Sequence, residues 1–180
     1  GFGELSLLLP ALCGLRAGGD WVLAIAPPHP LHAPACAAAG IDFEHLAVVS
    51  PAGSRDALWA AEQALQSGAP QAVLCWSAAA DSRAVRRLQV AAGQGGAAAF
   101  LFRPLSRARE PSAAALRLAL AAGPVSSQGG ALSVTILKRR GPPLANDIVL
   151  AVPRPALRRD HVLSSAVPAV ARAAPAACAA

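Results

Sequence analysis

The sequence contains no methionine and no tyrosine, and aromatic residues make up only 4% of its 180 residues. No apolar run reaches the roughly 18 to 20 residues that a membrane-spanning helix needs, because proline, glycine or a charged residue interrupts each run. The four cysteines lie far apart and form no C-x-x-C pair, a spacing that predicts neither a disulfide scaffold nor a zinc site. We therefore expect a reducing, cytosolic compartment. The missing methionine further predicts a fragment that lacks its N-terminus.

The charge is unevenly distributed along the chain, whose formal net charge is +6. Residues 1–80 carry two arginines and six acidic residues, whereas residues 81–180 carry fourteen lysines and arginines and four acidic residues. Two interpretations stay open. The basic half offers a surface to nucleic acid or to an acidic partner, or it is simply a solvated surface.

Strand-like and helix-like runs alternate along the first hundred residues. WVLAIAP (21–27) and AVLCWS (72–77) are short apolar runs typical of buried strands. SRDALWAAEQALQSG (54–68) has the apolar spacing of a helix that ends at a glycine. Further helices are expected over 5–15, over 31–39 and from Asp81 or Ser82 to Ala92, and further strands over 45–51 and 97–104. This alternation predicts an α/β fold whose mostly parallel sheet is covered on both faces.

The pattern changes at Pro104. A polar, basic loop leads into three strand-like runs that are separated by glycine and proline turns, over 116–121, 132–138 and 147–152. Because no helices lie between them, these strands are expected to extend the sheet in antiparallel fashion. The chain beyond is rich in proline, alanine and arginine, a composition that predicts a flexible tail. We thus expect one core over 1–150 and a tail over 151–180.

The first residues, GFGELS, raise the question of a phosphate-binding loop. P-loop proteins hold phosphates in a glycine-rich turn, and a lysine and then a serine or threonine follow its last glycine. Here Gly1 and Gly3 are present, but Glu4 and Leu5 follow them. Exchanging lysine for glutamate turns an attraction of roughly 4 kcal/mol to a charge about 4 Å away into a comparable repulsion. The stretch therefore predicts a degenerate loop that binds no nucleotide.

Several stretches, taken in order, resemble the ImuA family of degenerate RecA-like proteins of bacterial mutagenic cassettes, which is related to the cell-division inhibitor SulA. They are GFGELSLLLPAL, DALWAAEQAL, RRLQ and LKRRGPP, and the resemblance covers about residues 1–150. It implies a RecA-like three-layer α/β/α fold and a non-catalytic accessory role in SOS-induced translesion DNA synthesis in the cytoplasm. The implied partners are the polymerase-like protein ImuB and an error-prone polymerase, with RecA as a further candidate.

The resemblance also assigns the positions that catalysis would need. SRDALWAAEQALQSGAPQAVLCWS is similar to the helix and Walker B strand of RecA-type recombinases, and Trp76 stands where that strand ends in a magnesium-binding aspartate. Pro28 stands in place of the catalytic glutamate. With Glu4 and Leu5, this implies that the phosphate clamp, the metal ligands and the general base are all lost. We expect no enzymatic activity, no cofactor and no metal.

Basic residues are the main candidates for contacts. Lys138, Arg139 and Arg140 end a strand at the place where RecA-type filaments send basic residues to the neighbour's nucleotide. A solvated strand end, or a contact to a phosphate or an acidic partner, remains equally open. The loop after Phe102 carries Arg103, Arg107 and Arg109 without a stacking aromatic residue, so only weak DNA contact is expected there.

Partner contacts are also expected from the tail and from one tryptophan. Arg158 and Arg159 lie in the predicted tail, and Trp59 flanks the apolar seam of its helix, whereas Trp21 and Trp76 are expected to pack in the core. Two other functions stay open beside the accessory role. One is a SulA-like inhibitor of cell division that binds a cytoskeletal GTPase, and the other is an active RecA-like DNA-dependent ATPase.

Overall fold

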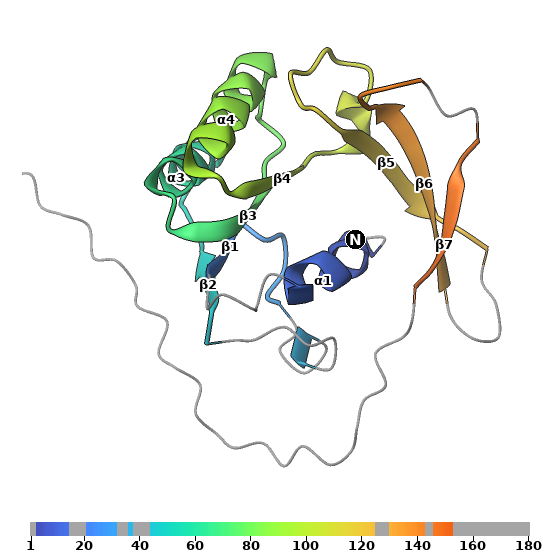
Figure 1. Ribbon diagram of the computed structural model, residues 1–180, viewed down its shortest axis with the longest axis horizontal. Coiled ribbons are helices and arrows are strands. Elements are labelled where there is room, and N and C mark those ends of the chain that lie inside the picture. Colours follow the sequence, from blue (N-terminus) through green and yellow to red (C-terminus); the bar gives the residue numbers. More distant parts are fainter. Residues whose placement is uncertain are drawn as a thin grey trace, which may run out of the picture.

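The computed structural model describes residues 3–14, 21–31, 36–37, 44–124, 130–142 and 146–152 (Figure 1). Its main elements follow in the order α1 (Glu4–Gly14), β1 (Trp21–Ile25), β2 (Leu46–Val49), α3 (Ser54–Ser67), β3 (Pro70–Trp76), α4 (Ser82–Gly95), β4 (Ala98–Phe102), β5 (Arg117–Ala122), β6 (Gly130–Lys138) and β7 (Ile148–Val152). Most of the helix predicted over 31–39 and the predicted tail beyond Val152 lie outside the described residues.

The first four strands form a parallel sheet in the order β2-β1-β3-β4. β3 lies inside this sheet, and its run from Ala72 to Cys75 is fully buried, which explains why the sequence there is apolar without alternation. The parallel sheet predicted from the alternation of strands and helices is confirmed.

Trp21 does not pack in the core as predicted. It begins β1 beyond the helix-covered part of the sheet and remains 47% exposed, with its ring edge-on to His45.

Helices α3 and α4 cover one face of the parallel sheet (Figure 1). Both helices present a small-residue and leucine seam to the strands: Ala57, Leu58, Ala61 and Leu65 from α3, and Ala84, Val85, Leu88 and Ala91 from α4. The carboxylate of Asp81 caps α4 by accepting a hydrogen bond from the backbone N–H of Ala84 at 2.7 Å. Gly68 and Gly96 end the two helices in the left-handed conformation. The end at Gly68 is the predicted one, whereas α4 runs past its predicted end at Ala92 to Gly95.

Helix α1 packs on the opposite face of the same sheet (Figure 1). Leu12 of α1 is buried against Ala72 and Leu74 of β3. Other side chains pack around this cluster from α1, from β1 and from the ends of β3 and β4: Leu5, Leu8, Val22, Trp76, Phe100 and Phe102. The parallel sheet is therefore enclosed by helices on both sides, and its core consists of two separate apolar clusters.

The last three strands form an antiparallel sheet of their own, in the order β5-β6-β7. The prediction that they extend the parallel sheet is wrong. The chain leaves β4 at Arg103 and Pro104 and enters a 3-10 turn (Leu105–Arg107), so that β5 pairs with β6 rather than with β4. Leu132 and Val134 of β6 are buried and give this second sheet its own apolar face.

Candidate functional site

The start of α1 has the geometry of a turn but not the chemistry of a phosphate loop. Gly3 has a φ of +95°, a conformation that favours glycine, and its carbonyl oxygen accepts a hydrogen bond from the N–H of Leu7 at 3.2 Å. Leu5 packs against the apolar cluster under α1, and Glu4 lines a neighbouring cleft. Gly1, the other glycine of the predicted loop, lies outside the described residues.

Trp76, the last residue of β3, stacks on an aromatic ring of the neighbouring strand. Its indole ring lies on the ring of Phe102, with the centroids 4.5 Å apart and the planes 13° apart. Both rings pack against the cluster that α1 covers. The position that the resemblance matches to a metal-binding aspartate thus packs against the apolar core.

The other positions matched to catalytic groups hold no ionisable side chain. Pro28 is exposed in the turn after β1, and a proline ring can neither accept a proton nor orient a water. Across the described ranges, no group of three or more His, Cys, Asp or Glu side chains is arranged to hold a metal ion. In the same ranges, no helix is long and apolar enough to cross a membrane.

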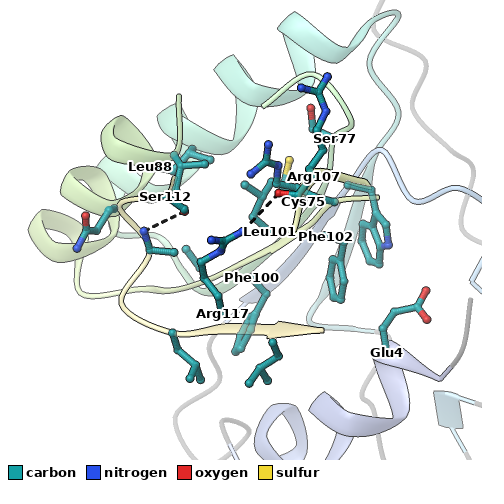
Figure 2. Close-up of a pocket in the computed structure, with 18 of the residues that line it drawn as sticks. Glu4, Cys75, Ser77, Leu88, Phe100, Leu101, Phe102, Arg107, Ser112 and Arg117 are labelled. Atoms are coloured by element: carbon teal, nitrogen blue, oxygen red, sulfur yellow. Dashed lines mark hydrogen bonds between the residues drawn. The ribbon is translucent and has the colours of Figure 1, made fainter. Parts of the chain in front are cut away.

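A cleft of about 1000 Å³ opens between the carboxyl ends of β3 and β4, helix α4 and the segment that leads into β5 (Figure 2). Its walls are mostly apolar and include Leu88, Leu101 and Leu116. The polar groups that line it are Glu4, Ser77, Gln89, Arg103, Arg107, Ser112 and Arg117. The carboxyl ends of parallel strands are where α/β proteins most often bind ligands.

Glu110 joins two of the arginines beside this cleft. Its carboxylate accepts hydrogen bonds from Arg107 and Arg103, and these contacts hold the pKa of Glu110 below its usual range. Arg117 donates to the backbone carbonyl oxygens of Glu110 and Ala108 at 2.9 and 2.7 Å. The basic loop is therefore a folded cluster rather than a free row of charges.

The sequence pointed to this loop, but three polar groups of the cleft and its rim were not predicted from it. Of the three arginines predicted there as candidates for weak DNA or partner contact, Arg103 and Arg107 both pair with Glu110, while Arg109 is exposed. Glu110, Arg117 and the buried Ser77 were not singled out. The single acidic residue in the stretch SRARE was the available signal, since a lone carboxylate among arginines favours ion pairing.

The basic end of β6 is partly engaged within the fold. Lys138 donates through Nζ to the carbonyl oxygen of Ser112 at 2.8 Å, and Arg139 donates through Nε to that of Pro142 at 2.7 Å. Arg140 is exposed beside them. Lys138 thus ties β6 to the segment that forms the cleft wall.

Trp59, the remaining predicted contact residue within the described ranges, does not join the cleft. Trp59 lies on α3 with 63% of its surface exposed and does not belong to the lining of the cleft. Arg158 and Arg159 lie outside the described residues.

These features define a mixed α/β protein built on a four-stranded parallel sheet with a separate antiparallel sheet. The chain belongs to the SulA family, because the family model described as cell division inhibitor SulA matches residues 4–99, more than half of the chain. The matched part runs from α1 into β4 and leaves out the antiparallel sheet.

Comparison with solved structures finds the crystal structure of SulA from Pseudomonas aeruginosa. It is 29% identical in sequence, with a TM-score of 0.48, over 55% of this chain and 85% of that chain. No curated protein sequence matches the chain.

Proposed function

We propose that the protein is a non-catalytic regulator of the bacterial SOS response that inhibits cell division by binding a protein of the division machinery in the cytoplasm. The observation that carries this proposal is the match of residues 4–99 to the family of cell division inhibitor SulA. A binding role also agrees with the chemistry at Glu4, Trp76 and Pro28, none of which supports nucleotide hydrolysis. The expected partner is the cytoskeletal GTPase of the division ring.

Inducible expression in a bacterium tests the proposal. We expect filamentous cells that replicate DNA without dividing, and co-sedimentation of the purified chain with the division GTPase. Trp59→Ala is expected to weaken the effect, because exposed tryptophans are frequent interface anchors. Val90→Ala, at another exposed apolar position, is the matched control. Normal division at equal expression, together with no binding to the GTPase, would contradict the proposal.

A second candidate is an accessory role in translesion synthesis, with an ImuB-like protein and an error-prone polymerase as partners. Its support is the resemblance to the ImuA family, part of which lies beyond the region matched by the SulA model: LKRRGPP spans the end of β6, where Arg140 is exposed. Under this candidate, the protein descends from a RecA-like three-layer fold and contacts DNA weakly and in a salt-sensitive way. RecA is a further possible partner.

Damage-induced mutation frequency separates the two candidates. Deletion of the gene lowers this frequency if the protein serves translesion synthesis, and pull-down from damaged cells then recovers the polymerase-like partner. Deletion instead abolishes damage-induced filamentation if the protein inhibits division. Arg140→Gln, compared with Arg86→Gln on α4, tests whether the basic end of β6 contributes to either partner.

The third function, an active RecA-like ATPase, is the least supported. Glu4 lines the cleft at the position matched to the phosphate-binding lysine, and Leu5 is packed in the core. We therefore expect no magnesium-dependent ATP turnover, with or without single-stranded DNA. Turnover that disappears on Glu4→Ala would overturn the assignment as a non-enzyme.

A further inference from the structure

We propose that Ser77 and Arg103 form an anion-binding end of the cleft, and that the cleft takes a small ligand with one carboxylate or phosphate group on an apolar body. The two side chains come from neighbouring strands. Trp76 of β3 and Phe102 of β4 are paired in the parallel sheet, and the N–H of Ser77 donates to the carbonyl oxygen of Phe102 at 3.1 Å. Ser77 and Arg103 follow this pair directly and therefore lie side by side.

Both side chains lie on the sheet face that α3 and α4 cover. Side chains alternate along a strand, so Ser77 shares the face of Cys75, and Arg103 shares that of Leu101. Cys75 is buried in the core under α3 and α4, and Leu101 packs against the same core. Figure 2 shows Ser77 beyond Cys75 at one end of the cleft.

Ser77 is buried without a partner. Only 5% of its surface is exposed, and its Oγ has no hydrogen-bond partner among the described residues. Nearly all buried polar groups in proteins are hydrogen-bonded, so the hydroxyl of Ser77 in the cleft wall is free to bond a ligand. The hydroxyl can donate its proton to an anionic oxygen.

Arg103 provides the charge. Its side chain is 12% exposed and donates to Glu110 through Nη2, while its Nε is buried and has no partner among the described residues. Arg103 and Arg107 share the single carboxylate of Glu110, so these three side chains keep one net positive charge, and Arg117 adds another at the cleft. An anionic group at Ser77 and Arg103 lowers this excess of positive charge and receives two hydrogen bonds.

The walls of the cleft away from Ser77 and Arg103 favour an apolar ligand body. The walls beyond the arginines are mainly leucine and alanine, including Leu88 and Ala92 of α4. A volume of about 1000 Å³ is at the upper end of the usual range for small-molecule sites. With one anion-binding end and mainly apolar walls elsewhere, a singly charged amphipathic molecule fits the cleft better than a polyphosphate.

Isothermal titration calorimetry with octanoate, octyl phosphate and octanol tests this assignment at concentrations below micelle formation. We expect at least one of the two anions to bind about tenfold or more tightly than octanol. The preferred anion then identifies the head group as a carboxylate or a phosphate. Ser77→Ala and Arg103→Gln should each lower the affinity for that anion about tenfold, and leave the affinity for octanol unchanged.

Matched controls are Ser106→Ala and Arg86→Gln, which change an exposed serine and an exposed arginine outside the anion-binding end. If Arg103→Gln fails to fold, Ser77→Ala carries the test, because its hydroxyl has no protein partner to lose. That variant should melt at the same or a higher temperature while it loses affinity for the anion. Equal binding of octanol and both anions, or full anion affinity in Ser77→Ala, would overturn the proposal.

Discussion

The indole ring of Trp76 lies flat on the ring of Phe102, with 4.5 Å between the centroids, at the carboxyl ends of two paired strands. Here both rings are packed in the cluster beneath α1. The stack therefore contributes to folding stability.

Trp76→Ala is expected to lower the free energy of unfolding by about 3 kcal/mol, because it removes a large packed ring and leaves a cavity. Urea unfolding followed by circular dichroism measures the change. Trp59→Ala is the control, and it should change the free energy by no more than about 0.5 kcal/mol since that ring is mostly exposed. Equal stability of the two variants would show that the stack contributes nothing.

Replacing either of two glycines of α4 by alanine should change the stability of the fold, in opposite directions at the two positions. A Cβ on Gly95 would come within 1.8 Å of the carbonyl oxygen of Leu65, where α3 and α4 meet closely, whereas a Cβ on Gly93 meets nothing within 4 Å. We expect Gly95→Ala to destabilise the fold by about 3 kcal/mol. Gly93→Ala should stabilise it by up to about 1 kcal/mol. Thermal melting of both variants checks the contrast, and a neutral Gly95→Ala would contradict the close approach of the helices.

The ion pairs of Glu110 predict a dependence of stability on pH. Hydrogen bonds from Arg107 and Arg103 lower the pKa of Glu110 in the folded state from its ordinary value of 4.5. A lowered folded pKa means that the stabilisation is present above about pH 4.5 and is lost as the pH falls through the folded pKa. The stability difference between the wild-type protein and Glu110→Gln should therefore be constant near neutral pH and shrink in acid. Urea unfolding of both proteins between about pH 3 and 7 measures it, and a difference that grows in acid would have the wrong sign.

Cys75 should be inert while the protein is folded. Burial raises the pKa of its thiol to about 11, so almost no thiolate is present at neutral pH. We expect iodoacetamide to label Cys75 only after unfolding, as read by peptide mass spectrometry. Cys36 is the internal control, because it is only partly buried. Labelling of Cys75 in the native protein at the same rate as Cys36 would contradict its buried position.

Local patterns in the sequence were sufficient to predict most elements. The apolar run AVLCWS is a buried strand, and the helix from Ser54 ends at Gly68, because burial and glycine conformation are local consequences of residue type. The cap at Asp81 follows from the same local chemistry. The prediction that Trp21 packs in the core was wrong, because the identity of a strand residue does not show where the covering helices end.

Local sequence patterns could not predict how the strands are arranged in sheets or where the cleft forms. Whether β5 pairs with β4 depends on the path of the loop between them, and that path is held by Glu110 and by the contacts of Arg117 to backbone carbonyls. The orphaned hydroxyl of Ser77 is likewise visible only once the fold shows what surrounds it. Such features depend on contacts between residues far apart in the sequence. The periodicity of apolar residues predicts local elements but not these contacts.

The two sheets of the protein can change independently of each other. No backbone hydrogen-bond ladder between described strands joins the antiparallel sheet to the parallel one, and the family match ends just inside β4. Residues of β5 that line the cleft, such as Leu118 and Leu120, are therefore able to change without disturbing the pairing of β1 to β4. Changes in one wall of the cleft can therefore alter what the cleft binds while the parallel sheet keeps its pairing.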